Sequence, residues 1–229
     1  SSEQLDRGLN GTLIVEERQP LPVHRDVTWV LDDWRITASG QVSETFGNIH
    51  DMAHAGRIGN TVTVNGSVQD QFPVRACERI RLRLVNAANA RIFALRFQGH
   101  RPLVVAIDGQ PGPPHEPEGG RIVVAPGMRC DVVIDAVGRA GERYEVQDVF
   151  YPREQFVLMD LAYGTAPRLA DTFPPVTTLT GNLVPEPDLP SASTHEILFG
   201  GGMMGNLHQA MLDGQPVDMR GCSGEARHG

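Results

Sequence analysis

The chain has 229 residues, 40% hydrophobic and 21% charged, which is the composition of an ordinary globular protein with room for one large or two small domains. The formal net charge of -8 argues against a nucleic-acid partner or an anionic membrane surface, and the 20 basic residues, all arginines, are scattered along the chain. No stretch approaches the roughly 20 apolar residues that span a bilayer, so the sequence predicts no membrane span.

Residues 1–17 have the pattern of the end of a β-domain. A glycine-containing turn, RGLNG, leads into the short apolar stretch TLIVEE, and Pro20 and Pro22 follow. We expect a strand over residues 12–16 that belongs to a domain lying upstream. Because such a strand would leave apolar side chains and an unpaired edge, we expect it to pack on the next domain or to pair with a second copy of the chain.

Strand signals recur through residues 24–164 at intervals of about 10–15 residues, each bounded by Gly, Pro or Asn. Apolar residues alternate with others at Val27, Trp29 and Leu31. Residues 61–66 form a β-branched run that ends in an Asn-Gly turn. Short strands at this regular spacing predict an all-β domain, either a sandwich or a small barrel with Greek-key connections.

Residues 78–88 give the clearest strand signal. Apolar and basic side chains alternate there, with Ile80, Leu82 and Leu84 on one side and Arg79, Arg81 and Arg83 on the other. This period of two predicts a strand with its apolar side on a core and its arginine side in water.

Little of the sequence predicts helix, although residues 50–59 and 89–92 could each hold one turn. Residues 165–193 are rich in Pro, Thr and Ser and lack periodicity, which is typical of a linker that runs over a surface. Residues 194–229 begin with the pattern of a strand and a hairpin, and we expect them to form an incomplete further unit.

Six motifs follow one another in the order RGLNGTLIVEE, VTWVLDDWRI, HAGRIGNTVTVNG, VRACERIRLRLVNAANARIFALRF, VVAIDGQP and VVAPGMRCDVVID. Together they resemble the multicopper oxidases, in particular the bacterial three-domain, laccase-like copper oxidases, from Gly8 to about Met219. Two positions depart from the family pattern, because Asn10 stands where tyrosine is usual and Cys77 stands where glycine is common.

The resemblance implies an all-β fold made of cupredoxin-like Greek-key β-barrels or sandwiches. Residues 1–17 would be the C-terminal strand of a first cupredoxin domain, and residues 24–164 would be a complete second domain. Residues 165–193 would be the linker, and residues 194–229 would be the incomplete start of a third domain. The missing parts of the first and third domains, in the same polypeptide, would then be the partners of this chain.

Multicopper oxidases oxidise phenols, related reductants or metal ions by single-electron steps and reduce dioxygen to water. The resemblance implies a mononuclear copper site built from two His, one Cys and often a Met, and a trinuclear cluster held by H-x-H motifs. This sequence contains no H-x-H. We therefore expect copper to bind in other parts of an intact parent protein, with no copper, no catalytic residue and no activity in this chain alone.

A second hypothesis comes from a different functional class. Some relatives have lost their coppers and act as scaffolds, so the chain would be a copperless cupredoxin-type structural or interaction module of the cell envelope. A two-domain relative of the nitrite reductase type is a weaker alternative, because the long linker and the third-domain entry argue against it. The resemblance implies a periplasmic or secreted location and leaves the substrate and the oligomeric state open.

Five residues are candidate metal ligands within the chain. His50 and His54 have i,i+4 spacing, so both imidazoles would face one way on a helix. The simpler interpretation is a polar loop, since no second motif supplies further ligands. Met203, Met204 and His208 form a cluster of soft ligands, for which the simpler interpretation is a glycine-rich loop with methionines that fill a core.

Other residues with possible chemistry are weaker candidates. Cys77 and Cys130 either form a disulfide or stay free, and we favour free thiols because no C-x-x-C occurs. Cys222 lacks the family spacing for half of a mononuclear copper site. Adjacent carboxylates such as Asp32 and Asp33 would point to opposite faces of a strand, so they are poor candidates for shared acid–base chemistry.

Overall fold

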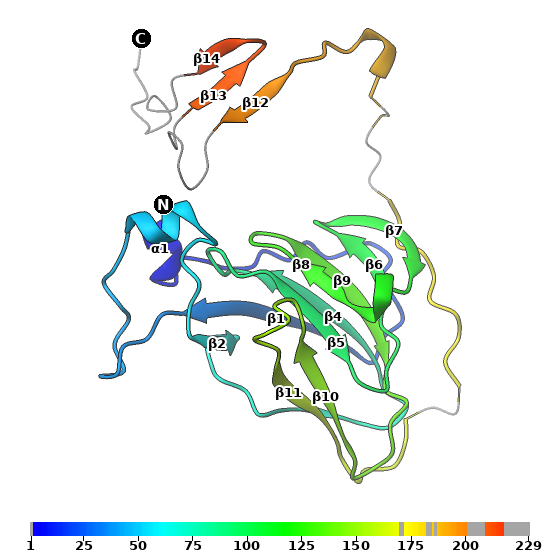
Figure 1. Cartoon of the computed structure of the whole chain (residues 1–229). Coiled ribbons are helices and arrows are strands. Elements are labelled where there is room, and N and C mark those ends of the chain that lie inside the picture. Colours follow the sequence, from blue (N-terminus) through cyan, green and yellow to red (C-terminus); the bar gives the residue numbers. More distant parts are fainter. Residues whose placement is uncertain (1, 170–171, 182–184, 186, 201–208, 218–229) are drawn as a thin grey trace.

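Two mixed β-sheets form most of the structure. The computed structural model describes residues 2–169, 172–181, 185, 187–200 and 209–217. The two sheets pack face to face as a sandwich with few helices (Figure 1), which confirms the expected all-β, cupredoxin-like fold.

Each sheet contains one parallel pair of strands among antiparallel neighbours. The first sheet has six strands in the order β2-β1-β4-β9-β6-β7, in which β1 and β4 are parallel. The second sheet has five strands in the order β3-β11-β10-β5-β8, in which β3 and β11 are parallel. The strands are β1 (Arg25–Trp34), β2 (Thr61–Val64), β3 (Gln71–Val74), β4 (Arg79–Asn86), β5 (Phe93–Phe97), β6 (Leu103–Ile107), β7 (Gln110–His115), β8 (Ile122–Val124), β9 (Arg129–Asp135), β10 (Arg143–Asp148) and β11 (Phe156–Tyr163).

Short helices and a small third sheet complete the described chain. α1 (Ser2–Asp6) precedes β1, and α2 (Ile49–Ala53) lies in the long connection between β1 and β2. The 3-10 turns are η1 (Glu118–Gly120) and η2 (Leu189–Ser191), and the third sheet consists of β12 (Ile197–Gly200), β13 (Gln209–Leu212) and β14 (Gln215–Val217). The third sheet is antiparallel and agrees with the expected strand and hairpin, whereas the turn of helix expected at residues 89–92 does not form. Within the described residues, no helix has the length and apolar character needed to cross a bilayer.

Two tight turns follow directly from local sequence. Asn65 and Gly66 have φ values of 53° and 76° and connect β2 to the chain before β3. Asp108 and Gly109 have φ values of 50° and 77° and join β6 to β7. Positive φ at both central residues is the geometry that Asn-Gly and Asp-Gly pairs favour, so the turn predicted at Asn65-Gly66 is confirmed.

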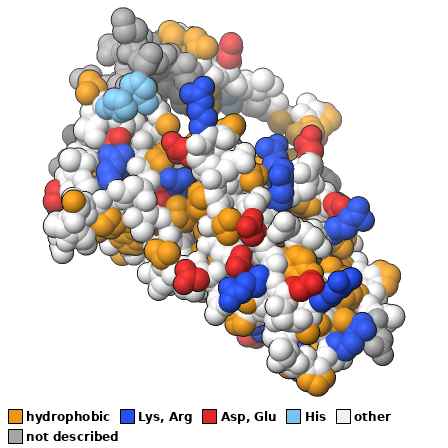
Figure 2. Space-filling view, turned by 60° about the horizontal axis from the view of Figure 1, so that its bottom comes forward, with side chains coloured by type: hydrophobic (Ala, Val, Ile, Leu, Met, Phe, Trp, Pro, Cys, Tyr) orange, Lys and Arg blue, Asp and Glu red, His pale blue; other side chains and the backbone are white. Residues whose placement is uncertain are grey.

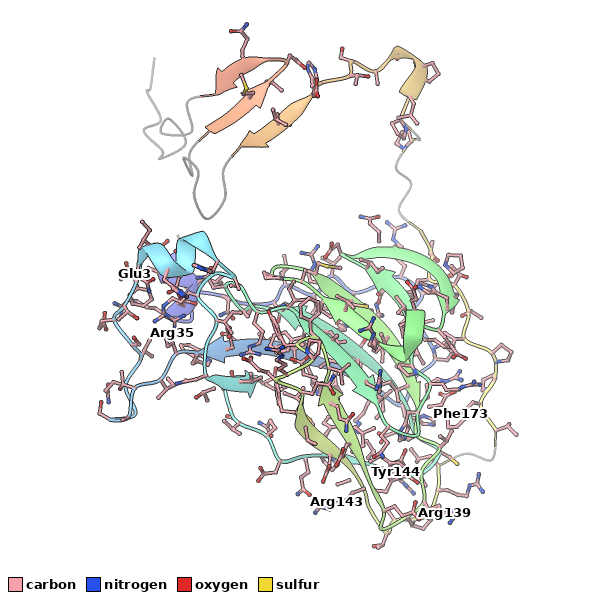
Figure 3. The ribbon with its side chains drawn as sticks, in the orientation of Figure 1. Glu3, Arg35, Arg139, Arg143, Tyr144 and Phe173 are labelled. Atoms are coloured by element: carbon pink, nitrogen blue, oxygen red, sulfur yellow. The ribbon has the colours of Figure 1, made fainter. Side chains whose placement is uncertain are left out.

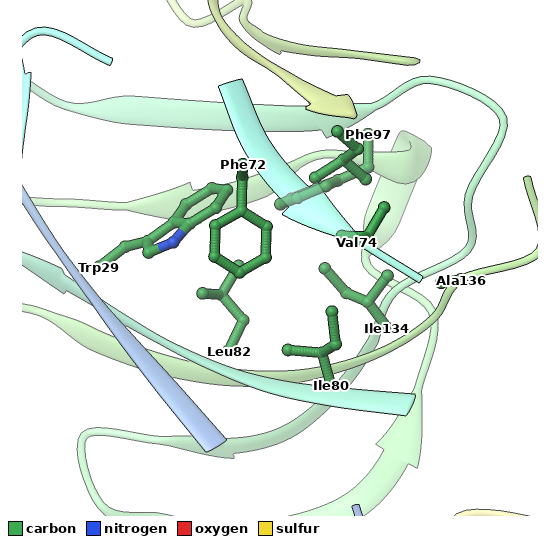
Figure 4. Close-up of a pocket in the computed structure, with 9 residues that line it drawn as sticks. Trp29, Phe72, Val74, Ile80, Leu82, Phe97, Ile134 and Ala136 are labelled. Carbon is green, nitrogen blue, oxygen red and sulfur yellow. The ribbon is translucent and has the colours of Figure 1, made fainter. Parts of the chain in front are cut away.

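The core lies between the two sheets and is built on aromatic side chains. The Trp29 ring is 2% exposed, meets Phe72 edge-on with 5.2 Å between ring centroids, and stacks on Phe97 at 6.2 Å. Figure 4 shows these rings around a cavity of about 10 Å³ whose lining is entirely apolar. A cavity of this size holds at most about one water molecule, so the described core offers no space for a ligand.

Tyr163, at the end of β11, closes one end of the sandwich through a buried hydrogen-bond chain. His100 Nδ1 donates to the Gln98 carbonyl at 2.7 Å, because a carbonyl only accepts. His100 Nε2 therefore accepts from the Tyr163 hydroxyl, which in turn accepts from the Gly138 N–H at 3.0 Å. Burial lowers the pKa of His100 and raises the pKa of Tyr163 to about 12, so both side chains stay neutral at physiological pH.

The arginine side of β4 is buried, and the prediction that it faces water is therefore wrong. Arg79 is 5% exposed and Arg81 is 2% exposed. Arg79 makes two hydrogen bonds of 2.6 and 2.7 Å to Asp135, and Arg81 pairs with Asp131 at 2.6 Å. These carboxylates lie on the neighbouring strand β9, so the alternating arginines can be buried without leaving unpaired charge.

Chain from both flanks of the sandwich covers this face of the first sheet. Leu21, before β1, and Leu179, after β11, are 7% and 5% exposed and pack with Val133 of β9. Arg79 also donates to the carbonyl of Pro174 at 2.7 Å and lies over the ring of Phe173, which Figure 3 labels beside the sandwich. The described part of the linker therefore follows the surface of the domain.

The strand expected at residues 12–16 does not form. The described structure has no helix or strand between α1 and β1. Leu13, Ile14 and Val15 are 92%, 47% and 78% exposed. A strand needs a neighbour to take its backbone hydrogen bonds, and no described strand pairs with this stretch. The apolar residues at 12–16 thus favour a strand, but no strand forms because no described neighbouring strand pairs with them.

Replacing Tyr163 with Phe should lower the free energy of unfolding by about 1–3 kcal/mol, because the buried His100 Nε2 and the Gly138 N–H both lose their partner. The measurement is urea denaturation at neutral pH. The matched control is Tyr144→Phe, whose hydroxyl bonds Glu142 at an exposed position and whose change should stay within about 0.5 kcal/mol. Equal losses in both variants would contradict a structural role for the chain of hydrogen bonds.

Candidate functional site

The chain before β1 is held on the sandwich by two charged clusters, which are the most elaborate polar sites of the described structure. In the first, the arginine cluster, Arg81 donates to Glu17 at 2.6 Å as well as to Asp131. Arg83 makes two hydrogen bonds of 2.7 Å to Asp26 and lies 3.7 Å from Glu17. The hydrogen bond from Arg81 lowers the pKa of Glu17, so the carboxylate stays charged.

In the second, the carboxylate cluster, buried acids meet buried arginines beneath α1. Asp6 is 7% exposed, lies 3.3 Å from Arg57 and accepts a hydrogen bond from Asn89 at 3.2 Å. Burial raises the pKa of Asp6, and the Asn89 hydrogen bond and the Arg57 charge oppose that shift. Because Asp6 ends α1, its contacts fix the helix on the sandwich.

Asp33 and Gly59 anchor the centre of the carboxylate cluster. Asp33 binds Arg91 at 3.0 Å and accepts from the Gly59 N–H, while Arg91 donates to the Gly59 carbonyl at 2.9 Å. A Cβ atom at Gly59 would lie 2.6 Å from the backbone of Trp34, so only glycine allows this close approach. The β1–β2 connection is thereby joined to the end of β1.

Asp32 is the most strongly perturbed acid of the carboxylate cluster. It accepts the Asp33 N–H at 2.8 Å and a side-chain hydrogen bond from Asn10. Burial, with the nearby Asp33 and Asp6 charges, raises the pKa of Asp32 to about 6. Asp32 and Asp33 have separate partners, as expected for adjacent strand residues, and do not form a shared acid–base pair.

The structure brings His50, in α2, close to His54, the non-helical residue that caps the C-terminal end of α2. Their rings stack with 4.2 Å between centroids and 14° between planes, as the i,i+4 spacing on a helix predicts. Arg35 and Asp51 join α2 to the end of β1 through two hydrogen bonds of 2.8 and 3.0 Å. Figure 3 labels Arg35 close to the helical end of the molecule, and Figure 2 shows histidine rings at the surface. Met203, Met204, His208 and Cys222 lie outside the described residues.

Cys77 and Cys130 are free thiols, as favoured from the sequence. Burial raises the pKa of Cys130 to about 12, so this thiol is protonated at physiological pH. Cys77 has a φ of 61° and accepts a hydrogen bond from Arg168 at 3.0 Å. The positive φ explains why glycine is common at this position in the family.

The described residues do not fit the copper sites of the family. Among them, no three His, Cys, Asp or Glu side chains lie close enough together to hold a metal ion. The carboxylates of the two clusters are instead bonded to Arg57, Arg81 and Arg91. These ion pairs hold chain segments in place.

A second hollow of the described structure is an open groove of about 590 Å³. Its walls include Val62 of β2, Phe156 and Val157 of β11, and Arg91. Val157 is 47% exposed, so the groove is a surface feature and no enclosed catalytic pocket. The face in Figure 2 mixes charges of both signs with apolar side chains, without a large patch of one sign.

Neither charged cluster has a clear local signal in the sequence. Asp6 and Arg57, or Glu17 and Arg81, lie far apart in the chain, and each looks like an ordinary surface residue. The one available signal was the regular Arg-x-Arg-x-Arg run of β4, which needs nearby carboxylates if it is buried.

Curated relatives include cell division proteins. FtsP of Edwardsiella tarda is 29% identical over 241 residues, which cover 96% of this chain and 49% of that protein. FtsP of Yersinia pestis is 35% identical over 134 residues, which cover 56% of this chain and 27% of that protein. This chain thus spans about half of these relatives or less.

Solved structures with the same fold include oxidases. The multi-copper oxidase from Pseudomonas thermotolerans matches with a TM-score of 0.73 at 30% identity, over 84% of this chain and 45% of that chain. The laccase-like multi-copper oxidase CueO from Ochrobactrum sp. matches with a TM-score of 0.57 at 32% identity, over 72% of this chain and 36% of that chain. The sequence profile of the multicopper oxidases matches residues 25–152, more than half of this chain, and covers most of the sandwich. By its sequence and its fold, the chain belongs to the multicopper oxidase family.

Proposed function

We propose that this chain is a structural and linking part of a cell-envelope protein that acts in cell division, rather than the catalytic part of an oxidase. One observation carries the proposal: the buried charges of the described structure hold flanking chain on the sandwich. Glu17 and Asp6 come from the segment before β1, and both bind buried arginines. The relatives named cell division protein FtsP support this reading.

The linking role rests on where the flanking segments run. The segment before β1 and the linker after β11 both cross the outer face of the first sheet and meet in one apolar cluster with Val105 and Val133. Arginine side chains of β4 bind both segments, Glu17 through Arg81 and Pro174 through Arg79. Because both flanking segments are attached to it, such a domain sets the distance and the relative orientation of the parts of the polypeptide on either side of it. Those parts include further cupredoxin domains.

The second candidate function is the segment of a laccase-like oxidase. The likeness to the oxidase of Pseudomonas thermotolerans favours it. In that case the copper ligands lie in other parts of the protein, which would oxidise phenols or metal ions with dioxygen as the acceptor. Both candidates place the protein in the periplasm or outside the cell, as the family resemblance implies.

Copper loading of the protein expressed from its entire coding region separates the two candidates. The structural function predicts no blue absorption band after removal of loosely bound metal, and no dioxygen-dependent oxidation of a phenol. Loss of the gene should delay division and lengthen the cells. A blue protein that turns over phenols would overturn the structural function, because the blue band requires a copper–thiolate site.

Replacing Glu17 with Gln should loosen the segment before β1, because Arg81 loses its charged partner on that segment. We expect faster amide exchange over residues 16–23 and a free energy of unfolding lower by about 1–2 kcal/mol. Hydrogen–deuterium exchange with mass spectrometry gives the first quantity and urea denaturation the second. The matched control is the exposed neighbour in Glu16→Gln, and identical exchange in both variants would argue against a holding role for Glu17.

Replacing Asp32 with Asn should stabilise the protein in a pH-dependent way. Because the folded pKa of Asp32 is raised to about 6, the folded state binds a proton that the unfolded chain lacks between about pH 4 and about pH 6. Wild-type stability from this group is therefore lost as the pH rises through that window. We expect Asp32→Asn to be more stable by about 2 kcal/mol above pH 7 and equal to wild type near pH 4. Urea denaturation across this range is the measurement, and a pH-independent difference would contradict it.

A further inference from the structure

The histidine pair at the C-terminal end of α2, His50 and His54, has features of a ligand set that the proposed structural function does not use. His50 and His54 are both exposed, and their rings lie parallel with 4.2 Å between centroids. Two imidazoles this close can both donate to one metal ion once their side-chain torsions turn the rings so that the free nitrogens converge on it, at the usual metal–nitrogen distance of about 2.0–2.1 Å.

The hydrogen bond of His54 decides which of its nitrogens is free. Its Nδ1 lies 2.9 Å from the His50 carbonyl, which only accepts, so Nδ1 carries the hydrogen. The lone pair is then on Nε2, which points away from that bond. Ligating histidines in proteins use this same arrangement, in which the second ring nitrogen donates to a carbonyl or carboxylate and holds the ring. Among the described residues, the His50 ring makes no hydrogen bond, so it can turn toward a shared ion.

The backbone beneath the pair is fixed by two further interactions. Asn48 caps α2 by accepting the Asp51 N–H at 2.9 Å. The Asp51 carboxylate is bonded to Arg35 and to the Asn48 amide, which removes it as a ligand and joins α2 to the end of β1. The two imidazoles thus stand on an anchored turn, and the carboxylate between them is already paired.

We propose that His50 and His54 bind one divalent transition-metal ion through their Nε2 atoms, with water completing the coordination. Imidazole ligands select Cu²⁺, Ni²⁺ and Zn²⁺ over Mg²⁺ and Ca²⁺, and affinity is highest for Cu²⁺ within the divalent series. The site contains no thiolate, so bound Cu²⁺ gives no blue band. It is independent of the structural function and of the family's copper sites.

Calorimetric titration of the 229-residue chain with Cu²⁺ and with Zn²⁺ tests the site. We expect one ion per chain, tighter binding of Cu²⁺ than of Zn²⁺, and no heat from Mg²⁺. His50→Ala and His54→Ala should each weaken binding at least about tenfold, because two linked ligands bind far better than one.

His115→Ala is the matched control, because His115 is also exposed and its Nδ1 also lies 2.9 Å from a backbone carbonyl, that of Pro113. The control should bind as tightly as wild type. Copper-induced broadening of the His50 and His54 ring signals in NMR spectra gives a second readout that does not depend on affinity. Unchanged binding by the doubly substituted His50→Ala, His54→Ala chain, or broadening confined to other histidines, would overturn the proposal.

Discussion

The position of the chain before β1 depends on one buried guanidinium, that of Arg81. It is 2% exposed, and an unpaired charge in such a place would be strongly unfavourable. Asp131, on the adjacent strand, and Glu17, on the flanking segment, make the burial possible at 2.6 Å each. Glu17 comes from outside the sandwich. The ion pair that allows Arg81 to be buried therefore also fixes the position of the flanking chain.

The same face explains how one domain can relate two neighbours. Leu21 and Leu179 lie on opposite flanks of the sandwich in sequence, yet both are buried against β6 and β9. Apolar contacts attach the two segments to the sheet but do not fix their orientation, because the hydrophobic effect is non-directional. The hydrogen bonds of the β4 arginines fix that orientation. Buried charge pairs add little net stability compared with apolar residues of similar size. Their presence here is consistent with a role in fixing one position of the flanking segments on the sheet.

Polar groups of this chain therefore divide into two kinds. The carboxylates beneath α1 are bonded to arginines and backbone, and even the perturbed Asp32 accepts two hydrogen bonds. The imidazoles of His50 and His54 are exposed, parallel and held on an anchored turn. Groups of the first kind maintain the fold, whereas the second kind remains accessible to an ion from solvent.

The sequence by itself determined the β-class of the fold, the strand at residues 79–86 and the positions of the tight turns. Alternation in β4 and the positive-φ pairs Asn65-Gly66 and Asp108-Gly109 are local properties, and local backbone preferences decide them. The family resemblance also follows from the order of motifs along the chain. For the histidine pair, spacing predicted a common face, and the structure added the stacking and the free nitrogen of His54.

Only the tertiary structure decided which polar residues are buried and which apolar residues are exposed. The arginine side of β4 is buried because carboxylates distant in sequence, such as Glu17 and Asp135, reach it. Residues 12–16 form no strand because backbone hydrogen bonds need a partner strand, which propensity cannot supply. In both cases the missing information is the identity of a neighbour across space, and a pattern of period two does not contain it.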